Sequence, residues 1–98
     1  MSQFMVEFDL PTPFTQEFIE KIPGQRMVIN RMLEVGKIHS YALSMDRERL
    51  WCIINAKSEL EVMEIIGEFP LHDFMTPHIT ELMFHNAVVF KVPAFSLN

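Results

Sequence analysis

Apolar and polar residues alternate at the start of the chain. Every second position of residues 3–10 is apolar, at Phe4, Val6, Phe8 and Leu10. A period of two is typical of a β-strand that buries one face. The Pro-Thr-Pro run at 11–13 ends this strand, and Thr12 or Thr15 is expected to cap a helix that follows.

The next apolar side chains recur every three or four residues, which predicts a helix. They are Phe18, Ile22, Ile29 and Leu33, with Met32 beside them. Pro23 and Gly24 interrupt this pattern, so we expect two helical pieces or a kink near residue 23. Gly36 is expected to end the helix, because glycine adopts the left-handed conformation at little cost.

Two strands, a second helix and a last strand complete the pattern. Residues 37–45 and 50–56 predict a hairpin around the polar turn 46–49. Ser58 and Glu61 have the spacing of a capping box, which predicts the start of a helix with an acidic outer face. Residues 78–85 predict the final strand.

The order of these elements, β-α-β-β-α-β, predicts a ferredoxin-like α+β fold with a four-stranded antiparallel sheet and two helices on one face. The other face carries Met5, Trp51 and Ile53, which are too apolar to face water. We therefore expect a homodimer in which a second subunit covers this face, as in dimeric α+β barrels. Residues 1–86 form this domain, and we interpret the apolar segment 87–98 as an arm on a neighbouring subunit.

Composition excludes several classes of protein. The 98 residues are 49% apolar, which is enough for one domain with its own core. A net charge of −5 without a Lys or Arg cluster argues against nucleic acid or an anionic membrane as a partner. The single cysteine, Cys52, favours a reducing compartment, and no stretch is suited to a leader or a membrane span, so we expect a cytoplasmic protein.

Metal and cofactor sites are not expected. His72, His78 and His85 are spaced six and seven apart, which does not place two of them on one helix face. Cys52 lacks the neighbours of a nucleophile and is expected to be a small core residue. The three glycines do not form a phosphate-binding loop, which argues against a nucleotide cofactor.

Two groups of residues are candidates for acid/base chemistry. Glu7 and Asp9 lie on the same face of the first strand, where an enclosed carboxyl would have a raised pKa and could carry a proton. The alternative is that both are solvated at the rim or paired with Lys37 or an arginine. His39 and Tyr41, two residues apart in the second strand, are the other candidates.

The register of the predicted hairpin decides which of its side chains line a cavity. Pairing Ser44 opposite Trp51 would put Ser40 on one face with Trp51 and Asn55, and a one-residue change in the turn would exchange the sets. We interpret Ser40, Trp51 and Asn55 as ligand-binding candidates. His39 and Tyr41 then lie on the opposite face of the same strand.

The run Phe69-Pro70-Leu71-His72-Asp73-Phe74-Met75 resembles the Pro-Leu-x-x-aromatic-Met signature of the muconolactone isomerase family. The resemblance implies a dimeric α+β barrel that can assemble into rings, and a cofactor-free reaction that moves a double bond by proton transfer. Aligned from Gly36, it places the family's first-helix acid at Gln25. It places the second-strand histidine at Ser40, with His39 adjacent.

We hypothesise a muconolactone isomerase-like enzyme that acts without a cofactor or metal on a small lactone or organic acid. Its catalytic candidates are Glu7, Asp9, His39 and Tyr41, and its ligand-binding candidates are Gln25, Ser40, Trp51 and Asn55. One alternative is a non-catalytic ligand-binding or assembly protein on the same fold, since Gln25 cannot shuttle a proton. Another is a cofactor-independent monooxygenase, a class that shares the fold.

Overall fold

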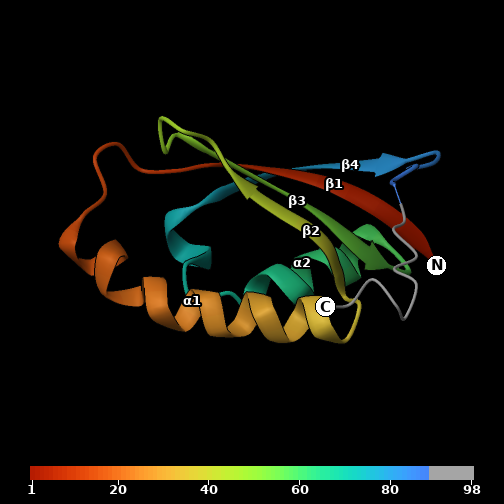
Figure 1. Ribbon diagram of the computed structural model, residues 1–98, viewed down its shortest axis with the longest axis horizontal. Coiled ribbons are helices and arrows are strands. Elements are labelled where there is room, and N and C mark those ends of the chain that lie inside the picture. The colour runs from red at the N-terminus through yellow and green to blue at the C-terminus, as the bar shows by residue number, and fades with distance from the viewer. Residues whose placement is uncertain (89–98) are drawn as a thin grey trace, which may run out of the picture.

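Strand β1 (Ser2–Asp9) lies inside a four-stranded antiparallel sheet of order β2-β3-β1-β4. The computed structural model describes residues 1–88, and both helices cover one face of this sheet (Figure 1). The elements are β1, α1 (Gln16–Glu34), β2 (Ile38–Leu43), β3 (Arg49–Ala56), α2 (Glu59–Gly67), the 3-10 turn η1 (His72–Phe74) and β4 (Thr76–Leu82). The predicted ferredoxin-like α+β fold is confirmed.

The alternation in β1 builds the core. Phe4, Val6 and Phe8 are at most 2% exposed and point toward the helices. Their partners on β3 are Ile54, Cys52 and Leu50, which the antiparallel register places on the same side. This strip of buried apolar side chains anchors the helices to the sheet.

Helix α1 begins and ends where the sequence predicts, but it is one continuous helix. The Thr15 hydroxyl accepts a hydrogen bond from the Phe18 N–H at 3.1 Å. At the other end Gly36 has φ of 80°, and the Lys37 N–H reaches the Met32 carbonyl at 2.9 Å, as in a Schellman motif. Of the two alternatives predicted at Pro23, two separate helical pieces are wrong, because buried residues on both sides of the proline hold the helix on the sheet. They are Phe18, Gln25, Ile29 and Met32.

Helix α2 begins at the predicted capping box. The Ser58 hydroxyl accepts from the Glu61 N–H, and Glu61 in turn accepts from the Lys57 N–H.

The predicted last strand, 78–85, is displaced from the observed β4. Pairing with β1 runs from Asp9↔Thr76 to Gln3↔Leu82, so the length of β1 fixes the bounds of β4.

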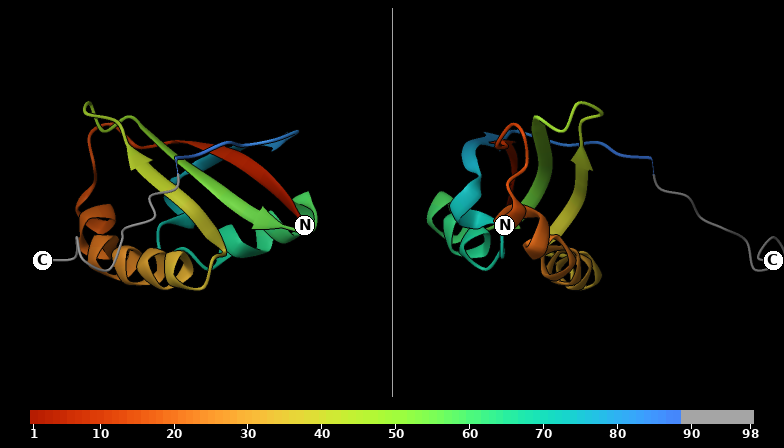
Figure 2. Two further views of the ribbon diagram at one scale, coloured as in Figure 1. Left: turned by 45° about the vertical axis from the view of Figure 1, so that its right-hand side comes forward. Right: turned by 90° about the vertical axis from the view of Figure 1, so that its left-hand side faces the viewer.

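The open face of the sheet is partly covered by the chain itself. His85 follows β4 at one edge, yet its ring lies 4.7 Å from the ring of His39 at the other edge. The segment after β4 therefore crosses the open face (Figure 2). This crossing is consistent with the 5% exposure of Ile53, for which the sequence predicted cover by a partner.

Two further expectations concern the arm 87–98 and membrane-spanning segments. Of the predicted arm 87–98, residues 87 and 88 are exposed and the rest lies outside the described residues. None of the helices in residues 1–88 is long and apolar enough to cross a membrane.

Candidate functional site

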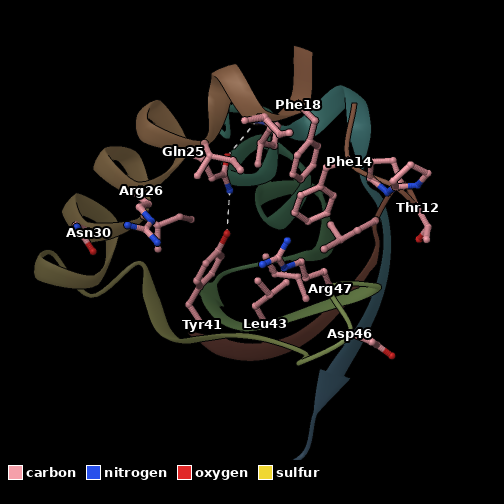
Figure 3. Close-up of a pocket in the computed structure, with 18 of the residues that line it drawn as sticks. Thr12, Phe14, Phe18, Gln25, Arg26, Asn30, Tyr41, Leu43, Asp46 and Arg47 are labelled. Atoms are coloured by element: carbon pink, nitrogen blue, oxygen red, sulfur yellow. Dashed lines mark hydrogen bonds between the residues drawn. The ribbon is translucent and has the colours of Figure 1, made fainter. Parts of the chain in front are cut away.

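A cleft of about 1190 Å³ lies between helix α1 and strand β2, on the helix-covered side of the sheet (Figure 3). The loop 10–14 and the β2–β3 turn border it. Most of its wall is apolar, with Leu10, Phe14, Phe18, Ile22, Ile29, Leu33, Leu43, Leu50 and Leu71 among the lining residues. Its polar lining includes Gln25, Arg26, Asn30, Tyr41 and Arg47. An apolar hollow with few polar groups is typical of a small-molecule site.

Gln25 is the buried polar residue of this cleft, at 3% exposure. Its Oε1 accepts a hydrogen bond from the Leu71 N–H at 3.1 Å, and its Nε2 donates to the Tyr41 hydroxyl at 3.2 Å. Because a backbone N–H can only donate, the amide oxygen must face Leu71 and the NH2 group must face Tyr41. The orientation of the Gln25 amide is therefore fixed by its neighbours.

The Tyr41 hydroxyl is left with a free proton by this arrangement. Its oxygen accepts from the NH2 group of Gln25, and no hydrogen bond within residues 1–88 uses the phenolic hydrogen, so that hydrogen is available to a group in the cleft. Burial raises the pKa of Tyr41, and this outweighs the opposing effect of the Gln25 hydrogen bond. Tyr41 is thus a neutral hydrogen-bond donor at physiological pH.

A bulge in β2 puts Tyr41 in the cleft. Ile38 pairs with Ile54, whereas Ser40 pairs with Ile53, so the regular alternation is interrupted between them. Ile38 and Tyr41 consequently share the helix-covered face at a spacing of three. The prediction that His39 and Tyr41 share a face is wrong, because His39 lies within the bulge and contacts His85 instead.

The carboxylates of β1 lie on the opposite face from Tyr41. Glu7 Oε2 is 2.7 Å from Arg49 Nη1, and Glu7 Oε1 accepts from the Trp51 indole at 2.8 Å. Asp9 pairs with His78 at 2.8 Å. Both oxygens of Glu7 are engaged, as in the arginine-paired alternative that the sequence left open.

The remaining ligand-binding candidates are divided between regions. Ser40 lies on the open face with Trp51, as the first of the two predicted registers grouped them, although Ala42 rather than Ser44 pairs with Trp51. The Asn55 amide donates to the Gly36 carbonyl at 2.7 Å and accepts from Gln3 at 3.0 Å. Asn55 thus ties β3 to the end of α1 and does not line the cleft.

Cys52 is buried in β3, next to Tyr41 of β2. It pairs with Tyr41 across β2 and β3, and burial raises its thiol pKa to about 12. A thiol of that pKa is protonated at neutral pH and is a poor nucleophile. Within residues 1–88, no three His, Cys, Asp or Glu side chains gather in a group that could hold a metal.

The sequence matches the family described as Muconolactone delta-isomerase over residues 3–87. The chain belongs to this family. None of the curated proteins matches it. Its structure is similar to that of 5-chloro-2-hydroxyhydroquinone dehydrochlorinase from Burkholderia phenoliruptrix AC1100 in complex with 2,5-dihydroxybenzoquinone, with a TM-score of 0.66 and 13% identity over 80% of this chain and 90% of that chain. At that identity the likeness shows a shared fold.

This muconolactone isomerase family member has cleft residues that the sequence did not predict. Arg26 and Asn30 are four apart on α1, a spacing that places them on one helix face. Arg47 belongs to the β2–β3 turn, where charged residues are ordinarily solvated. The i,i+4 spacing beside Gln25 was the available signal for Arg26 and Asn30, and nothing in the sequence singled out Arg47.

Proposed function

We propose that this member of the muconolactone isomerase family is a cofactor-free enzyme that moves a proton on a small ring bearing a carbonyl group. In this proposal the ring binds in the α1–β2 cleft, and Tyr41 donates a hydrogen bond to its carbonyl oxygen. The observation that carries the proposal is the chain of hydrogen bonds from the Leu71 N–H through Gln25 to Tyr41.

The chemistry of enolisation suits this arrangement. Removing a proton next to a carbonyl group puts negative charge on the carbonyl oxygen, and a fixed neutral donor stabilises that charge more than it stabilises the uncharged ketone. Apolar walls strengthen such a hydrogen bond by excluding water. Tyr41 is such a neutral donor, because its pKa is raised and the Gln25 amide fixes the position of its hydroxyl by a hydrogen bond.

The family signature contributes to the proposed site through its backbone. Leu71, in the run 69–75, provides the N–H that orients Gln25. Gln25 falls where the family resemblance expects an acid, and an amide cannot carry a proton. We therefore expect weak or no turnover of muconolactone itself, with Tyr41 as the acid for a different ring.

The proton leaves the ring carbon to solvent water in this proposal. Among residues 1–88, Asp46 is the one carboxylate that lines the cleft. Its Oδ1 accepts from the Ser44 hydroxyl at 2.6 Å and the Glu48 N–H at 2.9 Å, and these bonds lower its pKa. Asp46 is thus too weak a base to take the place of water in this step, and water is itself a weak base, so the site favours substrates whose C–H is already acidic. The similar dehydrochlorinase is named for a hydroxyhydroquinone and its structure holds a dihydroxybenzoquinone, both small oxygenated rings.

A second candidate is a non-catalytic protein that binds such rings. The weakness of Asp46 as a base, together with an amide at position 25, favours it. Both candidates predict that the protein binds such rings, but only the enzyme should accelerate the exchange of their hydrogens.

Exchange of ring hydrogens in D2O tests the proposal. The probes are carboxymethyl-substituted unsaturated lactones, muconolactone among them, and hydroxylated benzoquinones, followed by NMR above the spontaneous rate. We expect Tyr41→Phe to slow the exchange by about 10²–10⁴-fold, the usual contribution of a general acid. The wild-type rate should fall in alkaline solution as the phenol ionises, and because the pKa of Tyr41 is raised, the fall should come at a higher pH than for an ordinary tyrosine.

Ser40→Ala, one residue away but on the open face, is the matched control and should exchange at the wild-type rate. Full activity in Tyr41→Phe would contradict the assignment of Tyr41. Tight binding of the probes without exchange above background would establish the second candidate instead.

A further inference from the structure

Two histidines from opposite edges of the sheet meet at its open face. His39 belongs to the edge strand β2, and His85 follows β4, which is the other edge strand. Their ring centres are 4.7 Å apart, and their planes are inclined at 83° to one another. Nothing in the sequence joins these two residues, because only the crossing of the chain over the open face brings them together.

The nitrogen atoms of both rings lack partners in the part of the chain that the structure describes. The two other histidines, His72 and His78, each pair with an aspartate. No hydrogen bond or ion pair within residues 1–88 involves His39 or His85. A neutral imidazole has one nitrogen lone pair, so each ring can still bind a ligand.

The bulge in β2 accounts for the position of His39. The register with β3 shifts between Ile38 and Ser40, so His39 lies outside the regular pairing. Bulges commonly redirect a side chain in this way. His39 is exposed and His85 is half-buried. The exposed ring can therefore rotate between side-chain rotamers without displacing the core.

The separation of the two rings fits a shared metal ion. An imidazole nitrogen binds Zn²⁺ at about 2.0–2.1 Å, which puts each ring centre about 3.2 Å from the ion. For angles at the metal between about 90° and about 110°, from square-planar to tetrahedral geometry, the two ring centres lie about 4.5–5.2 Å apart. The observed 4.7 Å lies within this range.

We propose that His39 and His85 together bind one divalent transition-metal ion. The proposal concerns the open face and is independent of the function proposed for the cleft. Zn²⁺ and Cu²⁺ form the fitting class, because imidazole suits both ions and water can fill their remaining positions. No group of three ligands forms within residues 1–88, so the ion should exchange with the solution. The net charge of −5 favours the approach of a cation.

Such an ion would join two parts of the chain that few other interactions connect. No side-chain hydrogen bond or ion pair within residues 1–88 links the segment 83–88 to the rest of the fold. Met83 and Phe84 are 97% and 74% exposed, so they bury little apolar surface. An ion bound to both imidazoles would hold this segment across the open face and stabilise the folded chain.

Calorimetric titration with Zn²⁺, Cu²⁺ and Mg²⁺ tests the proposal. We expect one Zn²⁺ per chain, tighter binding of Cu²⁺, and no measurable binding of Mg²⁺, which prefers oxygen ligands. Joining two ligands raises affinity by about 10²–10⁴-fold, so His39→Gln and His85→Gln should each weaken Zn²⁺ binding at least about 100-fold. His72→Gln, at a side chain that is 43% exposed, is the matched control and should bind Zn²⁺ as the wild type does.

Thermal unfolding separates loss of the metal site from loss of folding. Without metal, His39→Gln should melt at the wild-type temperature, because the side chain is exposed. With Zn²⁺, the melting temperature should rise in the wild type and in His72→Gln, but not in His39→Gln or His85→Gln.

Three results would overturn the proposal. The first is a wild type that binds no Zn²⁺, and the second is an unchanged Zn²⁺ affinity in either His39→Gln or His85→Gln. The third is an equal loss of affinity in His72→Gln, since binding would then be spread over the exposed histidines.

Discussion

On the helix-covered face of the sheet, the polar side chains of the cleft are held in one arrangement, whereas on the open face they pair with charges in water. Gln25 is 3% exposed and bonded at both ends of its amide. The side chains of the Glu7–Arg49 pair are 35% and 54% exposed, and those of Asp9–His78 are 52% and 58% exposed. A buried hydrogen-bonded group has a fixed direction, but an exposed ion pair is screened and contributes little.

The two faces differ in how well their polar side chains are suited to a reaction. The carboxylates, which attract attention in the sequence, lie where cations and solvent surround them. The Gln25 amide and the Tyr41 phenol lie in the apolar cleft, where the phenolic proton has no partner in the part of the chain that the structure describes. This difference is the reason to assign the proposed site to the cleft rather than to the open face.

The largest expected effect concerns the assembly of the open face. We propose that a second copy covers this face, so light scattering should give at least twice the 11.5 kDa of one chain. Met5→Glu should lower that mass, because it places a carboxylate among apolar neighbours on the open face. Met45→Glu, at a side chain that is 99% exposed, is the control. A wild-type mass of one chain would contradict the proposal.

The next effect is on stability and contrasts the two faces directly. Gln25→Leu should lower the free energy of unfolding by about 2–3 kcal/mol, because it leaves the buried Leu71 N–H without an acceptor. Glu7→Gln should cost less than about 1 kcal/mol, since its ion pair is exposed. Urea unfolding measures both.

Gln25→Glu is the matched variant for Gln25→Leu, because a carboxyl group still accepts from Leu71. It should be the more stable of the two. It also restores the acid that the family resemblance expects, and we expect it to raise any trace of muconolactone isomerase activity. If Gln25→Leu lowered the free energy of unfolding by no more than Glu7→Gln does, the buried hydrogen bonds would stabilise the fold no more than the exposed ion pair, which would contradict this comparison.

Much of the fold could be predicted because local rules determine it. The alternation in β1, the Thr15 and Ser58 caps and the left-handed Gly36 each follow from one or two residues. The choice between two helical pieces and one helix at Pro23 could not, because burial on both sides of the proline outweighs its local preference. The bounds of β4 depend on a strand about seventy residues away in the sequence.

The candidate site was harder to predict for a related reason. Tyr41 and Gln25 were both named from the sequence, but no local signal joins them. The bulge before Ser40 rotates Tyr41 onto the helix-covered face, and the Leu71 N–H arrives from a distant loop. A one-residue irregularity reverses every side chain beyond it, so alternation alone could not assign the faces of β2.

The most direct test of the central claim asks which face a ring binds. The chain has one tryptophan, so Trp51 gives a single indole N–H signal from the open face, while the Gln25 side-chain amide reports on the cleft. In a ¹H–¹⁵N titration with 2,5-dihydroxybenzoquinone, we predict that the signals of the Gln25 side-chain amide and the Leu71 N–H shift and that the signal of the Trp51 indole does not. Movement of the Trp51 indole and the Glu7 amide, with Gln25 unmoved, would contradict it.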